Sequence, residues 1–145
     1  MVIETYSAEE TFEAGQELAK QAKANEVYAL LGDLGVGKTV FTQGFAKGLG
    51  ITEPVSSPTF TIVSEYDEGR LPFYHFDVYR ICDPEEMYEV GFDDYIESGG
   101  VCLIEWANLI GDLLPENITV ISIEKDLKQG FDYRKITVTK GGLAQ

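Results

Sequence analysis

The residues of this 145-residue chain best suited to chemistry are the eight from Gly32 to Thr39, which read GDLGVGKT. They fit the pattern G-x-x-x-x-G-K-[ST], whose glycines let the backbone curl so that successive N–H groups point at one phosphate cluster. Lys38 would neutralise the β- and γ-phosphates of a nucleotide, and the Thr39 hydroxyl would hold Mg²⁺. The alternative interpretation is a glycine-rich turn that binds no ligand.

The segments on either side of this loop must position it. The mostly apolar run Val27–Leu31 predicts a buried strand, and a helical pattern follows the loop and ends at Gly50. The apolar stripe of that helix is formed by Val40, Phe41, Phe45 and Leu49. A helix that starts here aims the positive end of its dipole at the phosphates. The strand–turn–helix context therefore favours nucleotide binding.

A second apolar run, Val101–Glu105, ends in a carboxylate. In P-loop proteins such a strand lies beside the phosphate-loop strand and presents its acid to Mg²⁺ or to the attacking water, which is the role we predict for Glu105. The alternative is a strand-terminal acid that caps the next segment. Trp106, the only tryptophan, either packs over the site or belongs to the core.

Asp77 lies within the aromatic-rich run Leu71–Tyr79. A carboxylate there is costly to bury unless it meets a cation or hydrogen-bond donors. This predicts either a metal-associated role or a salt bridge to Arg80 or Lys38. His75 shares the Asp77 face of the run, and we interpret it as a packed strand residue in preference to a catalytic base.

The rest of the chain alternates helical and strand patterns. The expected helices are 8–23, one that opens at Asp83, 92–97 and 109–114; the expected strands are 59–66 and 71–79 as a hairpin, 118–124 and 134–139. The pattern predicts an α/β fold, a P-loop NTPase-like three-layer sandwich with a mostly parallel central sheet, an antiparallel hairpin and closing strands. We expect residues 1–145 to form a single P-loop ATPase domain.

The chain carries a net charge of −14, with eleven acids against two bases between Glu65 and Glu97. Such a surface repels nucleic acid and anionic lipid, so we expect neither to bind the isolated chain. An acidic face suits a basic protein partner, although a merely solvated face has the same composition. The chain has no run of eighteen apolar residues, no secretion signal in MVIETYS, and only Cys82 and Cys102, which predicts a cytoplasmic protein.

Several classes of P-loop protein fit less well. A guanine-reading N/T-K-x-D motif is missing from the sequence, which favours adenine. Small-molecule kinases usually need several lid arginines. The chain has eleven Lys and Arg in total, with only two across its central third, which argues against a kinase. A small P-loop kinase that phosphorylates a metabolite stays the alternative function, and a nucleotide-gated binding module with negligible hydrolysis is a third.

Five stretches together resemble the TsaE (YjeE) family. They are GDLGVGKTVFTQGFAKGLG (Gly32–Gly50), SPTFTIVSEY (Ser57–Tyr66), YHFDVYR (Tyr74–Arg80), DPEE (Asp83–Glu86) and CLIEW (Cys102–Trp106). The P-loop is shared by many families, whereas SPTF, H-F-D-x-Y-R and IEW together are specific to this one. Val36 and Val40 stand where the family often has Ala and Thr, and neither change removes a ligand.

The resemblance implies a small ATPase of tRNA threonylcarbamoyladenosine (t6A) synthesis. Family members bind and hydrolyse ATP slowly and act as an accessory to the TsaB–TsaD complex. That complex transfers a threonylcarbamoyl group to the adenosine beside the anticodon of tRNA. The ATPase is thought to reset the transferase between turnovers.

The resemblance also implies roles for individual residues. Lys38, Asp77 and Glu105 would be catalytic, with Asp77 near the γ-phosphate, and Thr39 and Glu105 would hold Mg²⁺. Thr59, in the switch-like segment 57–60, would sense the γ-phosphate. The ATP-binding residues would be Gly32, Asp33, Leu34, Gly35, Val36, Gly37, Lys38, Thr39, Thr59 and Asp77. Adenine contacts are expected near residues 6–11 and 130–134.

Overall fold

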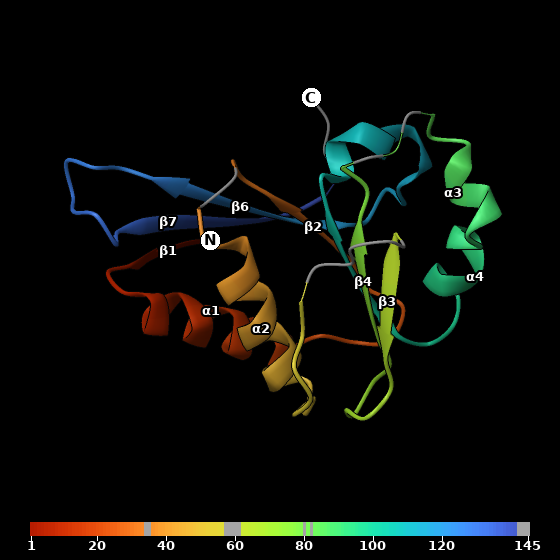
Figure 1. Ribbon diagram of the computed structural model, residues 1–145, viewed down its shortest axis with the longest axis horizontal. Helices are drawn as coiled ribbons and strands as arrows, with labels where there is room; N and C mark the ends of the chain where they lie inside the picture. The colour runs from red at the N-terminus through yellow and green to blue at the C-terminus, as the bar shows by residue number, and fades with distance from the viewer. Residues whose placement is uncertain (34–35, 57–61, 80, 82, 142–145) are drawn as a thin grey trace.

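The strands of the chain form a single sheet in the computed structural model, which describes residues 1–33, 36–56, 62–79, 81 and 83–141. The strands are β1 (Val2–Thr5), β2 (Val27–Leu31), β3 (Val63–Tyr66), β4 (Phe73–Asp77), β5 (Val101–Glu105), β6 (Thr119–Lys125) and β7 (Arg134–Lys140). The helices are α1 (Ala8–Lys20), α2 (Lys38–Gly48), α3 (Glu86–Glu89), α4 (Phe92–Ile96) and the 3₁₀ helix η1 (Ala107–Leu113). The strand order is β1-β7-β6-β2-β5-β4-β3 (Figure 1).

The centre of the sheet is parallel and both edges are antiparallel. Strands β6, β2, β5 and β4 run in one direction. Strand β3 forms an antiparallel hairpin with β4, while β7 and β1 close the opposite side in antiparallel pairs. The predicted parallel centre with a hairpin and closing strands is confirmed.

Helices cover both faces of the sheet, which gives the expected three layers (Figure 1). On one face, α1 and α2 bury their apolar stripes against Tyr28, Leu30 and Leu103. On the other face, α3, α4 and η1 pack through Met87, Phe92 and Ile110. They cover the strand side chains that point to this face, because successive side chains of a strand point to opposite faces of the sheet. The apolar run of β2 is continuous because both of its faces are buried.

Helices α1 and α2 pack closely because glycines form their contact. A Cβ atom at Gly44 of α2 would clash with the backbone carbonyl of Phe12 in α1, and one at Gly15 would clash with the carbonyl of Phe41. Only glycine allows the backbones to approach this far. The position of α2, and of the loop before it, therefore depends on these two residues.

Some element boundaries differ from the predictions. Helix α1 ends at Lys20, and its Ser7 hydroxyl accepts a hydrogen bond from the Glu10 N–H at 3.1 Å, as the capping pattern predicts. The helix expected from Asp83 is only Glu86–Glu89, because Asp83 uses its carboxylate in a tight turn with the Glu85 N–H. Strand β1 was not predicted, and it forms because β7 offers it a backbone edge.

Cys102 lies in the core and is 1% exposed. Burial raises the pKa of its thiol to about 12, which keeps it protonated and unreactive. Cys82 lies outside the described residues. In the part of the chain that the structure describes, every helix is too short or too polar to cross a membrane.

Candidate nucleotide-binding site

The predicted site residues lie where the parallel strands end. The loop follows β2, Glu105 is the last residue of β5, and Asp77 is the last residue of β4. In the sheet register, Glu105 is opposite Leu30 of β2 on one side and opposite Asp77 on the other. The structure thus brings both acids to the edge of the sheet where open α/β proteins bind ligands.

The phosphate-loop pattern becomes a left-handed turn at the start of α2. Gly37 has φ of 100°, a region that favours glycine, and it is the N-terminal cap of α2 without a side-chain hydrogen bond. The first N–H groups of the helix therefore lack the side-chain acceptor that a capping residue would supply. Thr39, in the first turn, is exposed, and Leu34 and Gly35 lie outside the described residues.

Arg134 of β7 braces this turn from outside the motif. Its Nε donates a hydrogen bond to the backbone carbonyl of Val36 at 2.7 Å, and its Nη1 donates to the carbonyls of Phe131 and Tyr133, just before β7. The guanidinium therefore ties the loop to β7. Local patterns in the sequence do not predict this contact, because the two residues are 98 positions apart.

The Lys38 ammonium is buried without a hydrogen-bond acceptor. The residue is 7% exposed, and its Nζ has no such acceptor among the described residues. It lies 4.2 Å from the centre of the Trp106 ring, which in turn contacts the exposed ring of Tyr79 at 4.7 Å. A cation–π contact compensates only part of the lost hydration. Lys38 is therefore suited to an incoming anion.

Glu105, in contrast, has a strong partner within the protein. Its Oε2 lies 2.7 Å from Nε2 of His75, and the two residues are 4% and 1% exposed. The η1 helix that follows Glu105 has Trp106 as its N-terminal cap, and the Trp106 side chain makes no capping hydrogen bond. His75 is packed in its strand, as interpreted from the sequence, and it also fixes the candidate acid.

Asp77 does not pair with Lys38. No ion pair joins the two residues in the described ranges, so that alternative is wrong for this structure. Asp77 is half-buried, and its Oδ1 accepts a hydrogen bond from the Tyr79 N–H at 3.0 Å, the geometry of a turn at the end of β4. Arg80 and Thr59 lie outside the described residues.

The two segments expected to contact adenine converge beside the loop. The rings of Tyr6 and Tyr133 lie 5.4 Å apart, and Thr11 and Arg134 are the nearest side chains to a Cβ placed on Gly37, at 4.0 and 3.8 Å. A cavity of about 540 Å³ also adjoins the loop, between Gly32, Asp33 and Val36 on one side and residues 122–125 at the end of β6 on the other. Aromatic rings and open space thus lie next to the phosphate loop.

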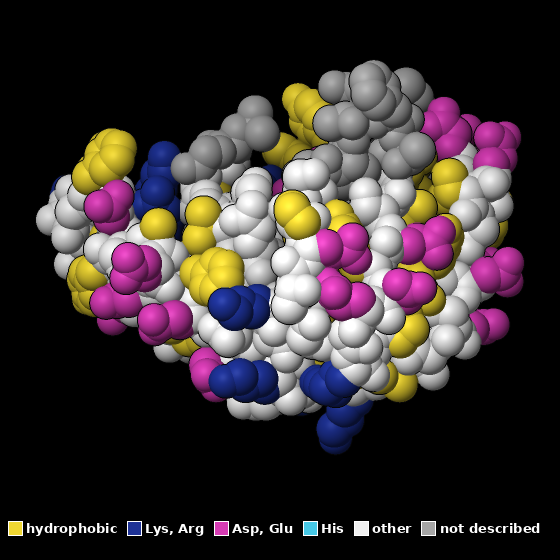
Figure 2. Space-filling view, turned by 60° about the horizontal axis from the view of Figure 1, so that its bottom comes forward, with side chains coloured by type: hydrophobic (Ala, Val, Ile, Leu, Met, Phe, Trp, Pro, Cys, Tyr) yellow, Lys and Arg dark blue, Asp and Glu magenta, His cyan; other side chains and the backbone are white. Residues whose placement is uncertain are grey.

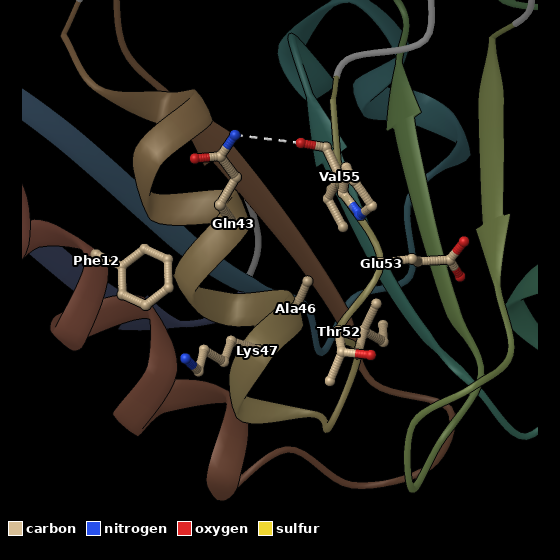
Figure 3. A pocket seen from close by; sticks show the side chains of 9 residues that line it. Phe12, Gln43, Ala46, Lys47, Thr52, Glu53 and Val55 are labelled. Carbon is tan, nitrogen blue, oxygen red and sulfur yellow. Dashed lines mark hydrogen bonds between the residues drawn. The ribbon is translucent and has the colours of Figure 1, made fainter.

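A second pocket, of about 340 Å³, lies beside the later half of α2 (Figure 3). Gln43 of α2 donates a hydrogen bond through Nε2 to the carbonyl of Val55 at 3.2 Å. This bond joins the helix to the segment that leads into residues 57–60, the predicted switch-like loop, which itself lies outside the described residues. None of the described phosphate-loop residues lines this pocket.

The parallel-centred sheet and the strand–loop–helix with its buried lysine define a P-loop NTPase-like protein. The model of the family "Threonylcarbamoyl adenosine biosynthesis protein TsaE" matches residues 5–136, so the chain belongs to the TsaE family.

Relatives of known name agree with this assignment. The chain is 50% identical over 138 residues to the tRNA threonylcarbamoyladenosine biosynthesis protein TsaE of Bacillus subtilis, covering 95% of this chain and 84% of that protein. The TsaE protein of Treponema pallidum is 40% identical over 117 residues, covering 81% and 86%. The crystal structure of Bacillus subtilis YdiB superimposes with a TM-score of 0.83 at 45% identity, over 98% of this chain and 86% of that one. The predicted family is confirmed.

Proposed function

We propose that this chain is a weak Mg²⁺-dependent ATPase that acts as an accessory protein in tRNA t6A biosynthesis. The family and the names of its relatives support the pathway. The observation that carries the ATP-binding part is the buried Lys38 ammonium, which has no hydrogen-bond acceptor in the described residues at the start of α2. Free N–H groups and a cation at one helix terminus form an anion site.

The phosphates would lie across residues 32–39. Their oxygens would accept hydrogen bonds from the N–H groups of the loop and of the first turn of α2, and Lys38 would leave the Trp106 ring to reach the β- and γ-phosphates. Arg134 would keep the loop in place by its bond to the Val36 carbonyl. The binding energy would come mainly from pairing a cation that has no anionic partner in the described part of the free protein.

The donor set fits Mg²⁺ as P-loop proteins bind it. Bound Mg²⁺ would offset charge on the β- and γ-phosphate oxygens, and Thr39 and Glu105 are the residues that would hold it. The described residues contain no cluster of three or more His, Cys, Asp or Glu around one point. Phosphate oxygens would complete the ion's ligands.

Hydrolysis needs a carboxylate to orient the attacking water. Asp77 and Glu105 are in register on neighbouring strands, and both are candidates. His75 holds one oxygen of Glu105 and thereby fixes the direction of that carboxylate. Thr59 would respond to the γ-phosphate from the switch-like loop.

The adenine would lie beside the rings of Tyr6 and Tyr133, where the two predicted segments meet. We further propose that residues 1–145 act as a single cytoplasmic ATPase domain. Its partner would be the TsaB–TsaD transferase. A net charge of −14 suits a protein partner better than direct contact with tRNA.

The test is ATP hydrolysis with and without purified TsaB–TsaD complex, using wild type, Lys38→Ala and Glu105→Ala. The proposal predicts slow hydrolysis by the chain alone, a changed rate with the complex, and loss of hydrolysis in both variants. Partner-independent transfer of phosphate to a small metabolite would overturn it and favour a kinase. Binding of tRNA by the purified chain at physiological salt would contradict the partner assignment.

A further inference from the structure

A groove of about 340 Å³ lies between β1 and α1, away from the phosphate loop. Its apolar part is formed by Ile3 of the strand and by Ala14 and Leu18 of the helix, which are partly buried against the main core. The groove follows the outer edge of the sheet, because β1 is the last strand on that side (Figure 1). An apolar groove at a sheet edge is a surface on which another chain can bury side chains.

The rim of this groove is acidic. Glu10, Glu13 and Glu17 recur at three- and four-residue spacing on one face of α1, and all three are exposed. Acidic side chains lie over α1 at the left of Figure 2. Lys20 pairs with Glu17 at 3.1 Å, and Glu10 accepts a hydrogen bond from the Tyr6 N–H. Glu13 has no ionic or hydrogen-bond partner among the described residues, so the rim attracts cations.

The backbone of β1 adds a second, independent feature. Met1 and Val138 exchange both of their backbone hydrogen bonds, at 3.0 and 2.8 Å. Because antiparallel pairs alternate, Ile3 also faces β7, while Val2 and Glu4 direct their N–H and C=O groups away from the sheet. Within the described residues, β1 pairs only with β7. Its outer edge can therefore accept one more strand.

We propose that this edge and groove bind an extended, positively charged segment of another protein, which adds to the sheet beside β1. Every second side chain of the added strand would point into the groove and pack on Ile3, Ala14 and Leu18. Lysine or arginine side chains of the segment would lie against Glu13 and its neighbours on the rim. The strand edge fixes the conformation of the segment, and the groove and rim select its side chains.

The charge of the chain decides between occupants. A second copy, with the same net charge of −14, would bring more acid to an acidic rim, and nucleic acid or an anionic membrane would be repelled. The negative potential that disfavours a second copy, nucleic acid and an anionic membrane attracts a cationic segment. The surface differs from the nucleotide site, so the proposal does not depend on ATP binding.

The test uses the full chain and a fluorescein-labelled eight-residue peptide in which isoleucine alternates with lysine. The structure predicts saturable binding by fluorescence anisotropy, at least tenfold weaker for the variant Glu13→Lys and unchanged for the matched control Glu9→Lys, which lies on α1 outside the groove. Hydrogen exchange should slow at the Val2 and Glu4 amides when the peptide binds. Glu13 and Glu9 are both exposed, so both variants should fold, which circular dichroism checks.

Four results would overturn the proposal. The first is absence of binding at millimolar peptide, and the second is equal binding of a peptide with alternate N-methylated amides, which cannot form a strand ladder. The third is an equal loss in Glu13→Lys and Glu9→Lys, which would mean attraction by overall charge alone. The fourth is sedimentation of the free chain as a dimer that the peptide dissociates, which would assign the groove to a second copy.

Discussion

Lys38 is the first residue of the helix that follows β2, and Glu105 is the last residue of the neighbouring strand β5. The two side chains have opposite surroundings. Both are nearly buried, at 7% and 4% exposure. The lysine has an aromatic ring below it and no hydrogen-bond acceptor in the described residues, whereas the glutamate is bonded to His75 at 2.7 Å. The comparison indicates that the cation is kept for a ligand, while the acid is oriented before the ligand arrives.

The largest expected effect comes from removing the cation. Lys38→Met keeps the length and apolar stem of the side chain and removes its charge, so affinity for ADP should fall about 100-fold, the value of one or two charge-assisted hydrogen bonds. Stability without nucleotide should stay equal or rise, because a buried ammonium without a hydrogen-bond acceptor is removed. Isothermal titration and thermal unfolding measure the two quantities.

The control for this prediction is Lys47→Met, at the other end of α2, which should change neither affinity nor stability. If Lys38→Met lowered stability markedly in the absence of nucleotide, the ammonium would have a structural role, and the contrast with Glu105 would fail.

Removing the acid should give the reverse pattern. Glu105→Ala leaves His75 buried without its partner, so the free energy of unfolding should fall by about 2 kcal/mol, the usual cost of leaving a buried hydrogen-bonding group unsatisfied. Affinity for ADP without Mg²⁺ should change by less than about threefold, because in the described part of the chain no hydrogen bond or ion pair joins the Glu105 carboxylate to the Lys38 ammonium that would bind the phosphates. Chemical denaturation and titration test this, with the exposed Glu116→Ala as control. A loss of ADP affinity as large as that of Lys38→Met would contradict it.

Gly44→Ala should disturb the helix that carries Lys38 and leave the His75–Glu105 pair unchanged. In Gly44→Ala the new methyl group meets the Phe12 carbonyl, so α2 must shift, and the expected destabilisation is about 2 kcal/mol. ADP affinity should fall with it, since the N-terminus of α2 carries Lys38, while the ring-proton NMR signals of His75 keep their positions. The control is Gly111→Ala, where a Cβ meets nothing within 4 Å. Shifted His75 signals would show that the two sides are coupled.

The smallest effect concerns an exposed carboxylate, which contrasts with Glu105. The backbone N–H groups of Glu53 and Thr52 donate to Glu68 and lower its pKa. A lowered pKa in the folded state stabilises the protein above the ordinary glutamate pKa, and this contribution is lost as the pH falls through the folded-state value. Glu68→Gln should therefore have a slightly lower melting temperature than wild type at pH 7 and an equal one at pH 3. A difference that persists at pH 3 would argue against this cause.

Local spacing in the sequence predicted one half of the site well. The pattern from Gly32 to Thr39 contains its own strand and helix signals, and the apolar run that ends at Glu105 marks a buried strand with a polar end. Both predictions use neighbours within a few residues. The structure confirms the strands and helices that carry these residues.

The other half depends on which strands become neighbours, which local patterns do not encode. His75 reaches Glu105 only because β4 and β5 pair in parallel, 30 residues apart. Arg134 reaches Val36 from the far end of the chain. Strand β1 has four residues, too few for a clear alternation, and it depends on pairing with β7. These contacts are tertiary, so local sequence patterns could indicate the individual residues but could not predict which residues they contact.

The most direct test of the account is a titration of Trp106 fluorescence with ADP. Trp106 is the only tryptophan, and the Lys38 ammonium lies 4.2 Å from its ring centre in the structure. The account predicts a saturable change in emission as the lysine leaves the ring for the phosphates, and no such change in Lys38→Met. Emission that stays constant in wild type while calorimetry records ADP binding, or an equal change in Lys38→Met, would contradict it.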